Sequence, residues 1–522
     1  MSLSTLRSPH LRIRPTTTVV VVGLLLLWQL VIGVFYRDAY TIATPAAIAV
    51  RAVEDFRFAL PNILTTAGEA GWGWVLGNLT AFAVASVAVL APITSRVLLR
   101  TSVVVYCLPV VAVGPILAIM MSQYWSVVVI SAQGVFFTTL IGTLIGLQST
   151  PSSRLDVVTA AGGTRWQAFT LARIRGAIPA VFSALKVAGP LAVLGAMIGE
   201  YLGAEKGLGV AMVYAQQSLN IDRTWALAFY ATLLAGAAYG LTALAERRLY
   251  FWRGEESVAD VSTADISDIS TNQRWWVRLI EFVATVAVVL GFWQLLVSSI
   301  NPYFAKRPAD VLQFLTSGSP EQLDPVWTAF GETILHSLIG FTGGLALAFA
   351  GAVAIVLSRT VESVLMPIAM TLRTVPLVAM TPLIALLFGR GLMSVLVVSS
   401  IVTFFPALVT IVSGLRAVPP AATEIVGVSG GSAWTALRLV QVPAALPSLF
   451  GAARVAAPLA VTGALLAEWL ATGNGAGFLM LRAGSVGNYI VLWTLVALVT
   501  IYAVALYGVA SAGERLLQRT RN

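Results

Sequence analysis

Two polar segments of the sequence carry the same small set of chemically active residues. They read Asp156-x5-Gly162-Gly163-x2-Trp166 and Glu424-x5-Gly430-Gly431-x2-Trp434. A carboxylate near the start of a short helix can accept a charge-assisted hydrogen bond from an arginine of another protein. Glycine permits a sharp turn, and tryptophan often anchors protein interfaces. The pattern, with Arg165 beside the first tryptophan, predicts docking segments over 152–175 and 420–443. For one segment alone, a solvated amphipathic loop with capping carboxylates is the alternative.

The two segments belong to an internal duplication that covers most of the chain. A shift of 268 residues superposes them, and the same shift continues without a gap through further distinctive residues. It pairs Pro179 with Pro447, Lys186 with Arg454, Glu200 with Glu468, Gly207 with Gly475, Gly209 with Gly477, and Trp225 with Trp493. A biased membrane composition would give scattered Leu, Ala and Val matches, but not these residue types in one register. We therefore predict two copies of one domain, over 1–245 and 275–522, joined by a polar linker over 246–274.

The composition indicates that both copies lie in a lipid bilayer. Of 522 residues, 58% are hydrophobic and 11% are charged, whereas a soluble domain carries about 25% charged residues. Residues 101–153 contain no Asp, Glu, Lys or Arg, which suffices for two spans of roughly 20 residues each. Backbone polar groups in hydrocarbon must be satisfied within the segment. We therefore expect an all-α polytopic membrane protein.

Six spans are expected in each copy, about twelve in total. They lie near 17–36, 70–92, 100–121, 124–148, 177–200 and 223–244, and near 280–300, 332–357, 363–388, 391–415, 444–468 and 488–511. The first apolar run has no A-x-A site after it and is interpreted as a retained span rather than a cleaved signal. Flanking arginines then fall on one side, which predicts that both termini and the linker are cytoplasmic. An even number of spans makes the two copies parallel.

The second polar segment resembles the EAA loop of bacterial binding-protein-dependent ABC importers, with the pattern E-A-A-x3-G-x9-I-x-L-P. Five residues stand at the spacing of that pattern: Glu424, Gly430, Val440, Val442 and Pro443. The first copy keeps Asp156 and Gly162 but has Arg175 where the pattern has proline. Beyond the loop, an acidic residue and a glycine-containing segment look like the nitrate, sulfonate and taurine branch of these permeases.

This resemblance implies a type I (MetI-like) importer permease in the bacterial inner membrane. It implies two ABC ATPase subunits docked in the cytoplasm and a substrate-binding protein outside. The implied coupling residues are Asp156, Gly162, Arg165, Trp166, Glu424, Gly430 and Trp434. ATP and Mg²⁺ would be held by the ATPase subunits and no cofactor by this chain, which has no Walker A sequence and is not expected to be an enzyme. The expected solute is small and anionic, with a thiamine-precursor or vitamin-like cargo as the alternative.

Ionisable residues inside spans are costly in lipid and are functional candidates by default. Lys186 and Arg454 fall near cytoplasmic span ends, where snorkelling of the long side chain is the favoured interpretation. Glu200 and Glu468 fall near the outer face, where they would either line a gate or brace the following loop.

The path between the copies has a further set of candidates. Arg373 lies inside the third span of the second copy, and its counterpart in the first copy is Tyr106. We expect its guanidinium to line the path and to suit an anionic cargo, with pairing to helix carbonyls as the alternative. Paired prolines are expected to kink helices around the path, with kinks in lipid-facing helices as the alternative: Pro109, Pro115, Pro376 and Pro382.

Other functions are less well supported. The net charge of +9 is explained by arginines at span ends, so no nucleic-acid partner is expected. One cysteine and two histidines exclude a Cys/His metal cluster. An intramembrane enzyme lacks an H-E-x-x-H motif and a nucleophile–base or metal set. An ion-driven secondary transporter remains the alternative, but it has no need for two matched acidic loops.

Overall fold

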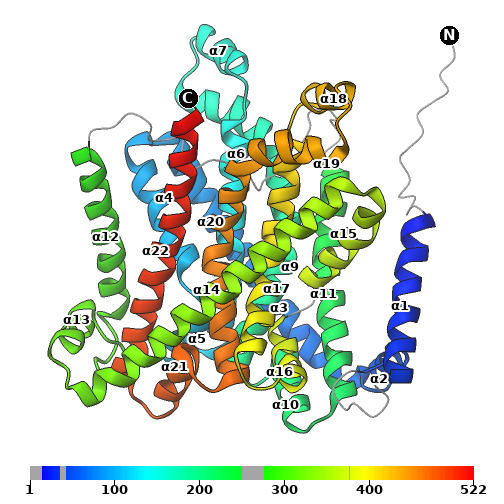
Figure 1. Cartoon of the computed structure of the whole chain (residues 1–522). Coiled ribbons are helices and arrows are strands. Elements are labelled where there is room, and N and C mark those ends of the chain that lie inside the picture. The colour runs from blue at the N-terminus through cyan, green and yellow to red at the C-terminus, as the bar shows by residue number, and fades with distance from the viewer. Residues whose placement is uncertain (1–14, 36–42, 250–274, 375–376, 522) are drawn as a thin grey trace.

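The computed structural model describes residues 15–35, 43–249, 275–374 and 377–521. Every regular element within these ranges is a helix (Figure 1), in agreement with the all-α prediction. The predictions for 246–274 and Pro376 lie largely or wholly outside the described residues, as does the side chain of Arg373.

The two copies contain the same elements in the same order, except that the second has an additional π-helical segment, η5, before α21. The first has α1 (Pro15–Phe35), α2 (Pro45–Glu54), α3 (Phe56–Leu90), α4 (Pro92–Cys107), α5 (Val110–Met120), α6 (Gln123–Gln148), α7 (Ser152–Ala160), α8 (Arg165–Ala168), η1 (Phe169–Arg173), α9 (Ile174–Tyr201), α10 (Leu208–Gln217) and α11 (Ile221–Leu249). The second has α12 (Trp275–Val297), α13 (Pro308–Ser317), α14 (Pro320–Leu357), α15 (Arg359–Thr374), α16 (Leu377–Phe388), α17 (Leu392–Arg416), α18 (Pro420–Val428), α19 (Ala433–Ala436), η4 (Leu437–Gln441), α20 (Val442–Ala467), η5 (Glu468–Thr472), α21 (Gly475–Ser485) and α22 (Tyr489–Arg521).

The described residues form nine helices that are long and apolar enough to cross a membrane, or ten if the pair α4–α5 is one bent span. The two other expected spans, α1 and α15–α16, contain side chains or residues outside the described set. Four short helices, α2, α10, α13 and α21, were not expected. Length explains this difference, because a search for runs of about 20 apolar residues does not detect helices of 10 or 11 residues.

Small residues hold the helices of each copy close together. A Cβ on Gly77 of α3 would lie 2.6 Å from the Ala132 carbonyl oxygen of α6, which is the close backbone approach typical of membrane helix pairs. The same hydrogen bond then ties the fourth span to the fifth in both copies. Ser131 Oγ donates to the Ala192 carbonyl oxygen at 2.8 Å, and Ser399 Oγ donates to that of Ala460 at 3.0 Å.

The copies are not separate bodies. Helix α12, the first helix of the second copy, packs against α4 of the first. Glu281 of α12 forms ion pairs there with Arg96 at 2.8 Å and Arg100 at 2.7 Å. Helix α5 also contacts α20, α21 and α22 of the second copy.

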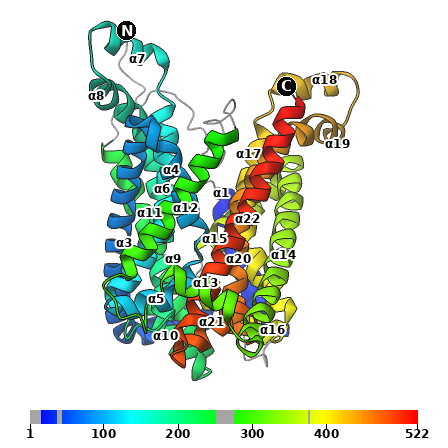
Figure 2. The same cartoon turned by 90° about the vertical axis from the view of Figure 1, so that its left-hand side faces the viewer.

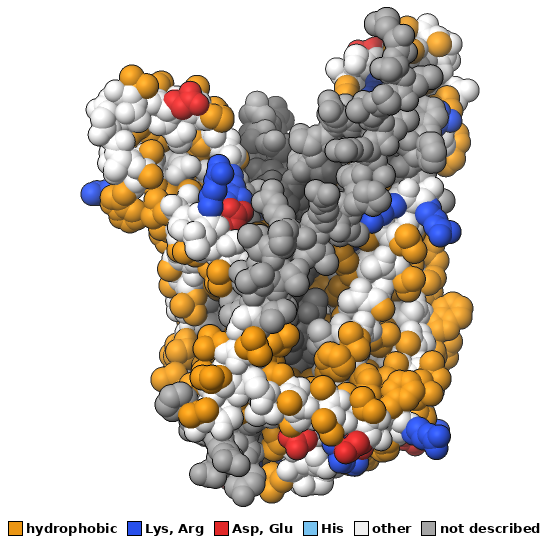
Figure 3. All heavy atoms as spheres, turned by 90° about the vertical axis from the view of Figure 1, so that its right-hand side faces the viewer, with side chains coloured by type: hydrophobic (Ala, Val, Ile, Leu, Met, Phe, Trp, Pro, Cys, Tyr) orange, Lys and Arg blue, Asp and Glu red, His pale blue; other side chains and the backbone are white. Residues whose placement is uncertain are grey.

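The copies converge at the end that carries α10 and α21 and diverge toward the end that carries α7 and α18 (Figure 2). One buried apolar cluster at the converging end includes Met197 and Leu208 of the first copy and Leu465 and Met480 of the second. In space-filling view the described residues form two lobes toward the opposite end (Figure 3). The described conformation is therefore closed at the α10/α21 end.

Candidate functional site

The two predicted docking segments form helical hairpins with the same turn. Gly162 and Gly430 follow α7 and α18 with φ of 76° and 80°, a left-handed conformation that costs glycine little. The next residue closes the turn, since Gly163 N donates to the Val158 carbonyl at 2.8 Å and Gly431 N does so to that of Val426 at the same distance. This is the glycine-terminated helix end known as the Schellman motif. Both glycines of the sequence pattern are thus explained by backbone geometry.

A capped helix follows each turn. Thr164 and Gln167 form a reciprocal capping box at the start of α8, and Ser432 Oγ accepts from Thr435 N at 3.3 Å at the start of α19. Capping satisfies amide groups that have no partner inside the helix. From these caps the chain runs through a π-helical turn into α9 and α20. The hairpins are therefore continuous with long helices of the bundle.

The outer surface of the hairpins carries matched acidic and apolar side chains. Asp156 and Glu424 are exposed, and Trp166 and Trp434 are 60% and 56% exposed. Two further matched apolar pairs are exposed in both copies: Val157 with Ile425 and Leu171 with Leu439. Exposed apolar groups of this kind are typical of surfaces that contact another protein or a membrane.

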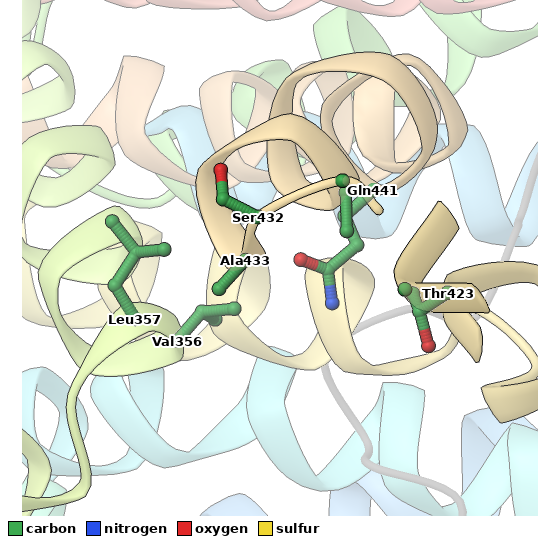
Figure 4. A pocket seen from close by; sticks show the side chains of 9 residues that line it. Val356, Leu357, Thr423, Ser432, Ala433 and Gln441 are labelled. Carbon is green, nitrogen blue, oxygen red and sulfur yellow. The ribbon is translucent and has the colours of Figure 1, made fainter. Parts of the chain in front are cut away.

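The hairpins differ in what surrounds the turn. In the second copy a cavity of about 260 Å³ opens between the end of α14 and the hairpin, lined by the labelled residues of Figure 4 and by Gly427, Gly431 and Ala436. Thr423, Ala433 and Gln441 of this lining correspond to larger residues in the first copy: Leu155, Arg165 and Arg173. Arg173 donates to the Leu147 carbonyl at the end of α6 at 3.0 Å.

At the opposite end, Glu200 is the centre of a buried cluster that we call the first glutamate cluster: Asn62, Thr66, Glu69 and Glu200. Three successive amides at the start of α10 bind to it. Gly207 N donates to Asn62 Oδ1 at 3.1 Å, Leu208 N donates to Thr66 Oγ1 at 2.9 Å, and Gly209 N donates to Glu200 Oε2. Thr66 Oγ1 donates in turn to Glu200 Oε1 at 2.6 Å.

The second glutamate cluster comprises Glu332, Thr333, His336 and Glu468. Gly475 N donates to Glu332 Oε2 at 2.8 Å, Ala476 N donates to Thr333 Oγ1 at 2.8 Å, and Gly477 N donates to Glu468 Oε2 at 2.9 Å. Thr333 Oγ1 donates to the same oxygen of Glu468 at 2.9 Å. Both clusters thus hold the first turn of a short helix, α10 or α21, by its free amides.

These clusters explain the glycines that follow each glutamate. A Cβ on Gly207 would lie 2.3 Å from Glu200 Cδ, and one on Gly475 would lie 2.2 Å from Glu468 Cδ. Both residues also have positive φ, of 127° and 82°. Of the two roles that the sequence left open for these glutamates, the geometry matches bracing of the next segment. Because α10 contacts α16 and α21 contacts α5, the braced helices also lie at the junction of the copies.

The charged path candidates Lys186 and Arg454 form matched ion pairs. Lys186 Nζ lies 2.9 Å from Glu246, and Arg454 lies 3.1 Å from Glu514. Glu246 and Glu514 are themselves related by the 268-residue shift. These pairs tie the fifth span to the sixth in each copy, a role that snorkelling did not anticipate.

Tyr106 and the prolines lie at the broken third span. The Tyr106 hydroxyl donates to the Val455 carbonyl of the second copy at 2.9 Å, and its ring stacks on Phe137 at 4.0 Å. Pro109 stands at the break between α4 and α5, where the axes bend by 92°, and Pro115 lies within α5. Gln133 of α6 donates to the freed Leu108 carbonyl at 2.7 Å. Pro382 lies in α16 with its side chain outside the described set.

Sequence reasoning missed the α3 and α14 members of the glutamate clusters. The signal was present, since a shift of 267 residues pairs Thr66 with Thr333 and Glu69 with His336. The first predicted span began at 70, after Thr66 and Glu69, whereas the second, which began at 332, contained Thr333 and His336 without singling them out. In the structure α3 and α14 run for 35 and 38 residues.

Comparison with known proteins gives two matches along the chain. Residues 74–250 and 325–522 each match the family of binding-protein-dependent transport system inner membrane components. The chain belongs to this family. Each match covers one copy, and together they span most of the sequence, so this family member is a tandem permease embedded in the membrane.

Curated relatives each align with about half of this permease. A riboflavin transport system permease protein of Chloroflexus aurantiacus is 33% identical over 45% of the chain and 88% of its own length. The taurine transport system permease protein of Escherichia coli is 26% identical over 45% and 86%. A putative aliphatic sulfonates transport permease protein of E. coli is 28% identical over 47% and 92%. No solved structure matches the chain.

Proposed function

We propose that this permease forms the membrane path of an ATP-driven importer and that its two hairpins dock two ABC ATPase subunits. The observation that carries the proposal is the repeated set of exposed acidic, tryptophan and aliphatic side chains on two hairpins at one end. Membership in a binding-protein-dependent transport family supports it. ATP and Mg²⁺ would be held by the ATPase subunits, and this chain would supply the path.

A long helix connects each hairpin to the opposite end of the molecule. The helical stretch that starts at α8 runs unbroken over Arg165–Tyr201, and that from α19 runs over Ala433–Thr472. At about 1.5 Å per residue, 37 and 40 residues extend roughly 55–60 Å. Their far ends carry Glu200 and Glu468, which hold α10 and α21. A displacement of a hairpin by an ATPase would therefore reach the helices that close the opposite end.

The direction of the path follows from the arginines. Residues that the positive-inside rule assigns to the cytoplasm, such as Arg154 and Arg175, lie at the hairpin end. We therefore place the hairpins and both termini in the cytoplasm, and a substrate-binding protein on the α10/α21 end. In this orientation the described conformation faces inward.

The proposed cargo is a small anion of the sulfonate or nitrate class. Taurine, sulfonate and nitrate permeases are among the relatives, although the riboflavin and formylaminopyrimidine permeases also match. Arg373 supplies the guanidinium that would receive an anion. Substitution of Arg373→Gln should abolish uptake of an anionic solute; unchanged uptake would exclude this role.

The docking proposal is tested by reversing the charge of both hairpins. The double variant Asp156→Lys with Glu424→Lys, expressed with the ATPase partner, should lose the co-purifying ATPase and solute uptake. Two exposed acids at the other end, Glu54 and Glu205, provide the matched control. Their reversal to Lys makes the same change in net charge and should leave the ATPase bound.

Retention of the ATPase with intact uptake in the hairpin double variant would refute the docking proposal. Loss of ATPase binding in the control as well would point to a general effect of charge. An ion-gradient transporter would accumulate solute without any ATPase partner.

A further inference from the structure

The two glutamate clusters differ in the side chain that lies beside the central glutamate, as well as in the acceptor for the first amide of the short helix, Asn62 or Glu332. In the second cluster His336 Nδ1 lies 2.8 Å from Glu468 Oε1. In the first cluster the corresponding residue is Glu69, which is hydrogen bonded to Glu200. A ring nitrogen can carry a hydrogen at neutral pH in either protonation state, whereas a carboxylate cannot donate at all.

We propose that the Glu69–Glu200 pair is a proton-binding site that holds one proton while the α10/α21 end is closed. Two carboxyl groups in hydrogen-bond contact must share at least one proton, because two ionised carboxylates can only accept. Both residues are buried, with 3% and 1% of their surface exposed. Burial in low dielectric further opposes two adjacent negative charges.

The surrounding hydrogen bonds supply no second hydrogen for the pair. Both oxygens of Glu200 are already in hydrogen bonds, one with Thr66 Oγ1 and one with Gly209 N. Glu69 Oε2 is buried and has no hydrogen-bond donor among the described residues. An oxygen without a donor is tolerable on a neutral acid but very costly on a carboxylate. The proton is therefore shared between Glu69 and Glu200.

No described cation neutralises the pair in place of a proton. The other titratable groups near the pair are Tyr124 of α6, on which Glu69 acts, and Tyr201 of α9, on which Glu200 acts. Both are neutral phenols at physiological pH. The Asn62 and Thr66 side chains that complete the cluster are uncharged.

The proton site lies next to a contact between the two copies. Glu200 holds Gly209 N at the start of α10, and α10 contacts α16 of the second copy. Loss of the proton would set two negative charges against each other at this contact. We infer that proton binding by the first copy favours closure of this end, whereas the second copy uses an imidazole hydrogen for the same purpose. This consequence for the path rests on the proposed function, but the proton site does not.

Infrared spectroscopy tests the site without any transport assay. The full chain in lipid nanodiscs near neutral pH should show the C=O stretch of a protonated carboxylic acid, and this band should disappear in Glu69→Gln. The amide introduced by this substitution keeps a hydrogen-bond donor toward Glu200, which preserves the fold. Glu54→Gln removes an exposed carboxylate and should leave the band unchanged.

A second variant distinguishes loss of the proton from loss of the fold. Glu69→His copies the arrangement of His336 and should keep the thermal stability of the wild type while it removes the band. A band that persists in both Glu69 variants would overturn the proposal. Absence of the band in wild type would also overturn it, as would its loss on addition of Na⁺ or K⁺, which would indicate a cation site.

Discussion

The two hairpins share a turn, an exposed acid and an exposed tryptophan, but they differ in net charge. Both turn on glycines with positive φ and both expose a carboxylate and a tryptophan. Yet the segment over 152–175 has four arginines and one aspartate, a net charge of +3, whereas that over 420–443 has one arginine and one glutamate, a net charge of 0. The second hairpin also borders the cavity of about 260 Å³. The glycines of the turn, the acid and the tryptophan thus stand in both copies, whereas none of the four arginines has an arginine counterpart in the second.

The two copies also differ in how deeply their matched ion pairs are buried. In the second copy the side chains of Arg454 and Glu514 are 8% and 7% exposed, whereas those of Lys186 and Glu246 are 22% and 27% exposed. A buried pair is costly to break because its partner is left as an uncompensated charge. A partly exposed pair can be replaced by water. Equivalent positions of the repeat should therefore respond unequally to substitution.

The largest predicted contrast follows from this difference. Arg454→Met should destabilise the chain by about 3–5 kcal/mol, whereas Lys186→Met should cost about 1 kcal/mol or less. Thermal unfolding midpoints in one detergent would measure both. The control is Arg454→Met combined with Glu514→Leu, which should recover much of the loss. Equal shifts in the two single variants would contradict the contrast.

A smaller contrast concerns docking. Trp166→Ala and Trp434→Ala should each weaken ATPase binding by about 2 kcal/mol, or roughly 30-fold. Binding should depend more on salt at the basic first hairpin. Arg165→Ala should therefore reduce the salt dependence, and Ala433→Arg should increase it. Titrations of the ATPase at low and high ionic strength would test this, and unchanged salt dependence in both variants would refute the inferred divergence.

The smallest effect is expected at the junction of α2 and α3. Asp55 accepts hydrogen bonds from Arg223 at 2.7 and 3.0 Å and from Arg51 at 2.8 Å. In the second copy, the same end of the molecule is held by a neutral hydrogen bond, in which Trp493 Nε1 donates to the Phe304 carbonyl at 3.0 Å. The hydrogen bond from Arg223 holds the pKa of Asp55 below its ordinary value of 3.8. Asp55→Asn should cost about 1 kcal/mol or less at neutral pH.

The stabilisation by Asp55 should depend on pH in a definite direction. Because the folded pKa is depressed, the stabilisation by Asp55 is complete above the unfolded pKa and is lost as pH falls through the folded value. The difference in unfolding midpoint between wild type and Asp55→Asn should therefore shrink below about pH 4. A difference that grows on acidification would contradict the assignment.

The sequence alone determined the helical membrane class, the duplication and the two hairpins. These rest on composition, on residue types repeated in one register, and on short motifs such as Gly162-Gly163 and Trp166, whose local geometry the chain itself dictates. The span boundaries at 70 and 332 were too late, because apolar runs mark the part of a helix in lipid and not the helix itself.

Only the tertiary structure decided which polar groups meet. Thr66 and Glu200 are 134 positions apart in the chain and hydrogen bond at 2.6 Å, and Tyr106 reaches Val455 across 349 positions. The side chain that faces each central glutamate, Glu69 in one copy and His336 in the other, likewise depends on how α3 packs on α9 and α14 on α20. Such contacts follow from helix rotation and crossing, which hydropathy does not encode because lipid and apolar side chains offer a helix nearly the same solvent.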